Sequence, residues 1–231
     1  MKRHWKSIFM LLFPIMSFGW VVSAAFIYAL IPDLDYISSL TIAATLTPTD
    51  PILAAAVIGG KFAMKHVPSH VRHLLQCESG CNDGMAFPFL YIGIYLLLSP
   101  SDTPYAVEEW FLVTWLYEVV LGVVLGAFIG YMGRKIMKFC EGRNFIDRQS
   151  FVAQYVALTL VTIGIALILG SDDLLAAFSC GTAFAWDGFF NKATEESHFS
   201  SILDLLFNCA CFIFIGALAP FDSFNDPSLG K

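Results

Sequence analysis

Two short polar motifs interrupt long apolar stretches of this sequence. The first motif is residues 45–51 (TLTPTDP), in which an aspartate lies between two prolines. Each proline removes a backbone donor and clashes with the preceding turn, so a helix is expected to break here. A broken helix offers backbone carbonyl and amide groups to an ion, and the aspartate adds a carboxylate. The candidate residues are Pro48, Thr49, Asp50 and Pro51. The alternative is an ordinary proline kink with polar caps.

The second motif is residues 78–84 (ESGCNDG), which precede an apolar stretch. Glu78 and Asn82 are four residues apart, as are Ser79 and Asp83, so the two pairs occupy adjacent faces of a helix. Their ligand atoms are all oxygens, which suit a hard cation and not zinc or copper. Burial of the Asp83 carboxylate would make a proton and a monovalent cation compete for the same oxygens. The alternative is a capped helix start near the membrane surface.

A third candidate is Glu118, which lies in an apolar stretch and is followed by glycines at intervals of four residues. These glycines are Gly122, Gly126 and Gly130. A row of small residues lets a second helix approach closely. Because Glu118 shares this face, we expect it to lie in a helix contact. A structural hydrogen-bonding role is favoured over direct ion ligation.

Composition shows what surrounds these motifs. The 231-residue chain is 57% hydrophobic and 14% charged, and its mean hydropathy is +0.69. Soluble domains are about 45–50% apolar and about 25% charged, so a soluble enzyme is excluded and lipid is the expected solvent. The net charge of -6 argues against nucleic acid as a partner, because no basic surface exists to neutralise phosphates.

Apolar stretches long enough to cross a bilayer predict an all-α, multi-pass membrane protein with about seven transmembrane helices. The predicted spans are 7–31, 37–60, 74–98, 110–133, 150–170, 173–190 and 201–220. Twelve of the thirteen Lys and Arg residues fall in alternate connections, which places the N-terminus on the cytoplasmic side. The opposite connections are acidic and include Asp172 and Asp173. No Lys or Arg lies within a predicted span, so a carboxylate in the membrane has no basic partner from these spans.

Three motifs together resemble the fungal sodium/proton antiporters of the monovalent cation:proton antiporter superfamily. They are residues 47–54 (TPTDPILA), 78–84 (ESGCNDG), and 186–190 (WDGFF) with 194–197 (TEES). The resemblance extends over essentially the whole chain. The third motif is typical of the fungal plasma-membrane branch, whereas the first two are shared more widely.

The resemblance implies a role for each matching residue. Asp83 would bind a proton and Na+ in alternation, with Li+ or K+ as further substrates, and Asn82 would be its characteristic neighbour. Thr49 and Asp50 would form the break in a discontinuous helix, and Ser79 would be an additional ion ligand. Glu78 would pair with an arginine on a later helix. The resemblance further implies alternating access, a homodimer in the plasma membrane, a role in monovalent cation and pH homeostasis, and no cofactor beyond the transported ions.

The length departs from this family. Its members contain two inverted repeats of about six helices each, and seven spans cannot supply both. We therefore expect residues 1–231 to be a partial transmembrane domain of an incomplete inverted-repeat antiporter fold. It would lack the first helices and the C-terminal helices of the second repeat, including the expected arginine, and would have little transport activity alone.

Two other functions remain open. A cation channel subunit would conduct ions without coupled proton movement. An intramembrane aspartyl protease could use Asp50 and Asp83 as a dyad that shares one proton. Neither acid lies in a GxGD motif, and prolines flank Asp50, so a transporter that is not an enzyme is the favoured interpretation.

Overall fold

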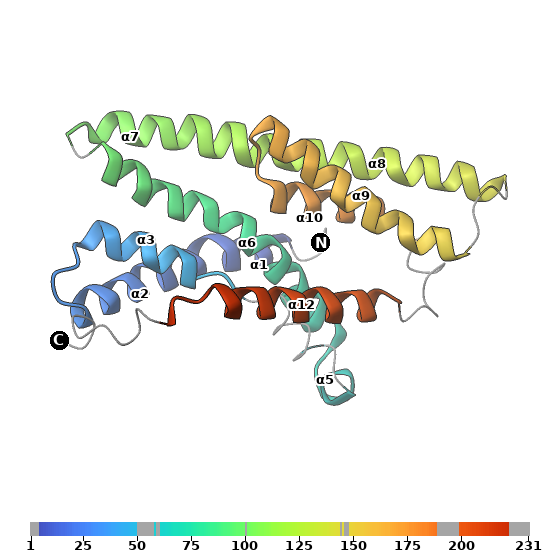
Figure 1. Cartoon of the computed structure of the whole chain (residues 1–231), viewed down its shortest axis with the longest axis horizontal. Helices are drawn as coiled ribbons and strands as arrows, with labels where there is room; N and C mark the ends of the chain where they lie inside the picture. The colour runs from blue at the N-terminus through green and yellow to red at the C-terminus, as the bar shows by residue number, and fades with distance from the viewer. Residues whose placement is uncertain are drawn as a thin grey trace.

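The computed structural model describes residues 5–49, 58, 61–99, 101–143, 145, 148–188 and 199–221. Within these residues every regular element is a helix (Figure 1), which confirms the predicted all-α class. The elements are α1 (Trp5–Met10), η1 (Leu11–Ile15), α2 (Met16–Leu30), α3 (Tyr36–Leu46), α5 (Lys61–His66), α6 (Ser69–Leu98), α7 (Thr103–Glu109), η2 (Trp110–Val120), α8 (Leu121–Gly142), α9 (Arg148–Leu169), α10 (Asp173–Phe184) and α12 (Phe199–Leu218).

Two segments of wider π-helix join their neighbours into longer rods. The segment η1 contains Pro14, which cannot donate to the helical hydrogen-bond ladder, and connects α1 with α2. The segment η2 connects α7 with α8 into one rod, Thr103–Gly142.

The helices agree with the predicted membrane spans in position and differ in length. Each predicted span contains a helix, and three helical stretches are long and apolar enough to cross a membrane. These are Trp5–Leu30, Ser69–Leu98 and Thr103–Gly142. The apolar helices Tyr36–Leu46, Ala153–Leu169, Asp173–Phe184 and Cys209–Leu218 are shorter. A membrane protein is therefore confirmed, whereas the count of seven spans stays a prediction.

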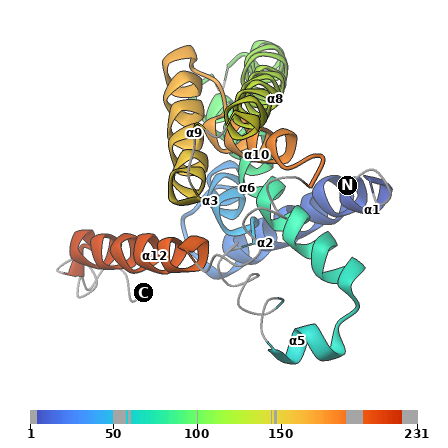
Figure 2. The same cartoon turned by 90° about the vertical axis from the view of Figure 1, so that its right-hand side faces the viewer.

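Helix α6 lies at the centre of the molecule. It is flanked by α2 and α3 on one side and by the Thr103–Gly142 rod on the other, while α10 packs against α8 and α9 (Figures 1 and 2). A small apolar core joins the first helical rod, Trp5–Leu30, to α6. It consists of Leu12, Met16, Cys81 and Met85. The polar motif of α6 is thus surrounded by other helices.

Tryptophan side chains tie neighbouring helices together. Trp20 Nε1 donates to the Leu40 carbonyl over 2.7 Å, and so links α2 to α3. Trp110 Nε1 donates over 2.7 Å to the carbonyl of Pro88, and so links η2 to α6. Such bonds are stronger away from water than at a wet surface, so they help to set the positions of α3 and η2 around α6.

The glycines of α8 form a close contact with α10, as the small-residue spacing predicts. A Cβ added at Gly126 would lie 2.0 Å from the Ala176 carbonyl oxygen, and one added at Gly130 would lie 2.1 Å from the Cys180 carbonyl oxygen. Both distances are far below van der Waals contact, so no larger residue fits without moving the α10 backbone.

Candidate ion-binding site

The first motif begins where α3 ends. The last residue of α3 is Leu46, and Thr47 forms its C-cap. Thr47 Oγ1 donates to the Ala43 carbonyl over 2.6 Å, which satisfies one acceptor of the final turn. Pro48 comes next and cannot continue the ladder. The helix thus ends where the prolines predict, while Asp50 and Pro51 lie outside the described residues, so the second half of the break stays a prediction.

The second motif lies well inside α6 and not at its start. Helix α6 begins at Ser69, more than two turns before Glu78. Ser79 and Asn82 are each only 2% exposed. Residues 78–84 therefore do not cap a helix, and the alternative of a capped start is wrong. Buried polar groups within a membrane helix are functional candidates.

Hydrogen bonds connect the two motifs. Asn82 Nδ2 donates to Thr49 Oγ1 over 2.7 Å and to Glu78 Oε1 over 3.0 Å. Thr49 Oγ1 lies 3.3 Å from Ser79 Oγ, and Ser79 Oγ lies 3.5 Å from the Thr49 carbonyl oxygen. The segment that follows α3 is thereby held against α6, and the spacing argument that pairs Glu78 with Asn82 is confirmed.

Asn82 leaves one buried acceptor without a partner. Both polar contacts of its amide group involve Nδ2, while Oδ1 is buried and accepts no hydrogen bond. A buried acceptor without a donor costs about 1–3 kcal/mol, and a bound cation would offset that cost. The oxygens of Thr49, Ser79 and Asn82 form a donor set that suits a hard monovalent cation.

The two acids of this motif differ in their surroundings. Glu78 accepts the hydrogen bond from Asn82 and makes no ion pair with any described residue, so its expected pairing with an arginine stays a prediction. Asp83 is half-buried on α6, one turn after Ser79. Its role as the ion carrier is likewise a prediction.

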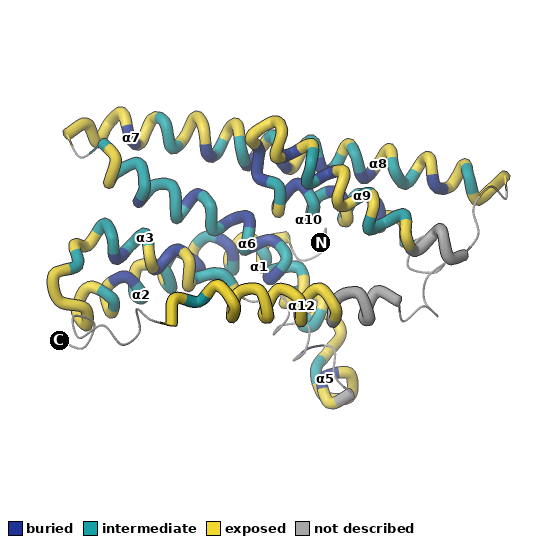
Figure 3. The backbone as a smooth tube through the Cα atoms, in the orientation of Figure 1, coloured by how far each residue is buried: buried dark blue, intermediate teal, exposed yellow. Residues whose placement is uncertain are grey.

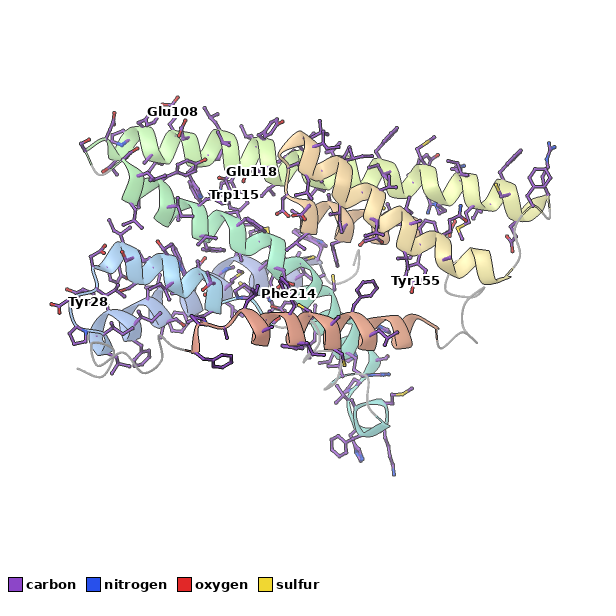
Figure 4. All side chains as sticks on the ribbon, in the orientation of Figure 1. Tyr28, Glu108, Trp115, Glu118, Tyr155 and Phe214 are labelled. Atoms are coloured by element: carbon purple, nitrogen blue, oxygen red, sulfur yellow. The ribbon has the colours of Figure 1, made fainter. Side chains whose placement is uncertain are left out.

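Glu118 does not join this cluster. It lies in η2 beside the start of α10 (Figure 4). Its backbone carbonyl accepts from Ser171 Oγ over 3.1 Å and from the Asp172 amide over 3.3 Å. The backbone of Glu118 therefore lies at a helix contact, while a structural hydrogen-bonding role of its side chain stays a prediction.

Asp172 is a buried acid whose burial the sequence did not reveal. It lies in a connection, as predicted, but it is only 6% exposed. Oδ1 accepts from the Leu175 amide over 2.9 Å and so caps α10. The available signal was a pair of aspartates between two apolar stretches with no Lys or Arg beside them. Hydropathy assigns such a pair to a wet loop.

Comparison with known proteins gives a consistent result over the whole chain. The family model described as "Sodium/hydrogen exchanger, transmembrane" matches residues 1–230. The chain is 49% identical over 230 residues to Na+/H+ antiporter 2 of Zygosaccharomyces rouxii, covering 100% of this chain and 28% of that protein. It is 50% identical over 230 residues to a Na+/H+ antiporter of Saccharomyces cerevisiae, covering 100% of this chain and 23% of that protein.

The chain thus spans less than a third of the length of these two relatives. No solved structure matches the chain significantly. The fungal relatives confirm the resemblance that the motifs indicated. By its family match over residues 1–230, the chain belongs to the sodium/hydrogen exchanger family of membrane proteins.

Proposed function

We propose that this chain forms the ion-binding part of a Na+/H+ antiporter. The observation that carries the proposal is the hydrogen bonding of Asn82. Its Nδ2 group joins the end of α3 at Thr49 to Glu78 on α6, and its Oδ1 atom is buried without a partner. The two relatives named above are named as Na+/H+ antiporters, and each matches this chain over its whole length, which supports the same activity for the complete protein.

In this mechanism Asp83 binds either a proton or Na+. A half-buried carboxylate inside a membrane helix is costly when charged, so in this proposal a proton or Na+ neutralises it, one at a time. The oxygens of Asn82, Ser79 and Thr49 would complete the coordination of Na+, together with Asp50 and the carbonyls of the helix break. Binding of either cation excludes the other, which couples their opposite movements.

The same proposal includes the setting of the site. Further helices beyond this chain would supply the arginine partner of Glu78 and the second half of the antiporter fold. The complete transporter would be a homodimer in the plasma membrane, with the N-terminus of this chain cytoplasmic, and would also accept Li+ or K+. It needs no cofactor and is not an enzyme.

A chimera tests this proposal. The chain replaces the matching segment of the Saccharomyces cerevisiae relative, to which it is 50% identical, and the chimera is reconstituted in vesicles that contain a pH-sensitive dye. We expect a Na+ gradient to drive opposite proton movement, and Asp83→Asn to abolish it. The matched control is Asp35→Asn, which changes an exposed acid at a helix cap and keeps an acceptor there.

Three results would contradict the proposal. Exchange that persists in Asp83→Asn would show that this carboxylate does not carry the transported ions. Current without coupled proton movement would identify a channel. Robust exchange by the 231-residue chain alone would show that further helices are not needed.

A further inference from the structure

The connection between α9 and α10 meets the Thr103–Gly142 rod far from its ends (Figures 1 and 4). Ser171 and Asp172 are 7% and 6% exposed and both bond to the Glu118 carbonyl. Glu118 lies fifteen residues after the start of the rod, which is about 20 Å at about 1.5 Å per residue. Asp172 is therefore buried between helices and lies far from either end of the rod.

Only one of the two carboxylate oxygens of Asp172 takes part in capping α10. Oδ1 accepts from the Leu175 amide, whereas Oδ2 is buried and has no hydrogen-bond partner. Oδ2 lies 3.1 Å from the position that a Cβ at Gly84 would occupy, so it packs directly against α6. Pro88 has no N–H, so the Gly84 carbonyl also lacks its regular helical donor. Asp172 Oδ2 thus packs against a residue of α6 whose carbonyl lacks its regular helical donor.

The charges around Asp172 are negative. Glu118 of η2 contacts Asp172 through its backbone carbonyl, Asp173 follows Asp172 on α10, and Asp83 precedes Gly84 in the sequence of α6. The salt bridges of Asp187 with Arg134 and Lys138 do not involve Asp172. A buried carboxylate without a counter-charge is expensive. A proton or a monovalent cation at Oδ2 would relieve this cost.

We propose that the Asp172 carboxyl group is a second binding site for a monovalent cation, a proton or Na+, separate from the site at Asp83. The ion occupies Oδ2, on the side that faces Gly84, while Oδ1 keeps its bond to the Leu175 amide. This goes beyond the proposed antiport, because Asp172 belongs to neither polar motif. Loss of the ion would place a bare negative charge between α6, η2 and α10, so the occupancy of Asp172 bears on their packing.

Infrared spectroscopy of the purified 231-residue chain in lipid nanodiscs tests this site. Near pH 6, exposed carboxyl groups with ordinary pKa values of about 4 are ionised, so a protonated carboxyl band reports buried acids. The informative variant is Asp172→Asn, which keeps a cap acceptor for Leu175 but cannot bind a proton or carry charge. Asp173→Asn is the matched control, and Asp83→Asn separates this site from the first.

In choline chloride we expect a protonated carboxyl band that Asp172→Asn removes and that Asp173→Asn and Asp83→Asn retain. Replacement of choline chloride by NaCl distinguishes the two occupants. Loss of the band in NaCl identifies Na+ as a competitor for Oδ2, whereas a band that persists identifies a proton-only site.

An Asp172→Asn spectrum identical to that of the unmodified chain in both salts would overturn the proposal, since Asp172 would then be an ionised helix cap only. If Asp172→Asn does not fold, Asp172→Ser supplies the same test, because serine also caps helices. This result is independent of the exchange assay. Asp83→Asn can abolish exchange in vesicles while the infrared band of Asp172 stays unchanged.

Discussion

Helices α6 and α12 are both long and apolar, yet they have opposite surroundings. In α6 the buried residues include small and polar ones, among them Ser79, Asn82 and Gly84. In α12 every side chain that the structure describes is exposed, and Ile213 is 73% exposed (Figure 3). Lipid is as apolar as leucine, so apolar side chains need no protein partner there, whereas polar and small residues do. The contrast between α6 and α12 therefore follows the small and polar residues that α6 carries.

The glycines show the same contrast. A Cβ at Gly93 of α6 would overlap the Thr41 side chain of α3, closer than van der Waals contact allows, whereas one at Gly216 of α12 would have no atom within 4 Å. The packed helices depend on close backbone approach, and α12 does not. Substitutions in α6, α8 and α10 should therefore lower the stability of the protein strongly, whereas substitutions in α12 should change it little.

The largest effect is expected for Gly126→Ala. The added Cβ would lie 2.0 Å from the Ala176 carbonyl oxygen, a backbone atom that cannot rotate away. Overpacking of this kind costs about 3 kcal/mol, and the melting temperature in detergent should fall by about 6–12 °C. Gly216→Ala is the control and should leave the melting temperature unchanged or slightly raised. Equal effects of the two substitutions would refute the close α8–α10 contact.

A smaller loss is expected for Asn82→Ala. The change removes the donor that serves Thr49 Oγ1 and Glu78 Oε1, and so leaves two polar groups with one bond fewer. The free energy of unfolding should fall by about 2 kcal/mol, measured by thermal denaturation of the purified chain. Cys209→Ala, at an exposed position of α12, is the control. A neutral Asn82→Ala would mean that Asn82 does not hold the α3 end against α6.

Trp110→Phe should have an effect of about 1 kcal/mol, because it removes one hydrogen bond, the 2.7 Å bond to the Pro88 carbonyl. The matched control is Trp5→Phe, since Trp5 is 60% exposed. Thermal denaturation of both variants side by side gives the comparison. If Trp5→Phe were the more damaging change, the link between η2 and α6 would not contribute to stability.

The smallest effect is expected for Asp35→Ala, and it should disappear in acid. Hydrogen bonds from Ser38 and from the Ile37 amide hold the pKa of the exposed Asp35 carboxyl below its usual value. The stability that this cap contributes is therefore present above the ordinary pKa and is lost as the pH falls through the lowered one. The melting temperatures of the unmodified chain and Asp35→Ala should differ at neutral pH and converge at strongly acidic pH. A difference that persists at acidic pH would mean that the carboxylate charge is not what caps α3.

Several local features could be predicted from residue spacing. The prolines after Thr47 predicted the end of α3, the four-residue interval predicted the Glu78–Asn82 bond, and the glycine row predicted a close helix contact. Each of these depends on one segment of backbone, for which helical geometry is known in advance. The ends of helices were predicted less well. Helix α6 begins before the apolar stretch 74–98, and the Thr103–Gly142 rod extends beyond the apolar stretch 110–133 at both ends.

The candidate site was predicted in its residues but not in its contacts. Thr49 and Asn82 are thirty-three residues apart, and no spacing rule states which faces of two helices meet. The burial of Asp172 could not be predicted either, because hydropathy does not show how deeply a connection packs. Nor could the sequence show that the apolar side chains of α12 are exposed, since apolar residues also dominate the helices that pack together.

The sequence by itself determined that lipid surrounds this protein, which stretches are helical, where one helix ends and which glycines allow close contact. These properties follow from composition and from the fixed repeat of a single helix. Only the tertiary structure decided that Thr49 lies against Asn82, that Asp172 is buried beside Gly84, and that α12 faces outward. Those properties depend on how helices are placed relative to one another, and many placements satisfy the same apolar pattern because lipid covers whatever the protein leaves exposed.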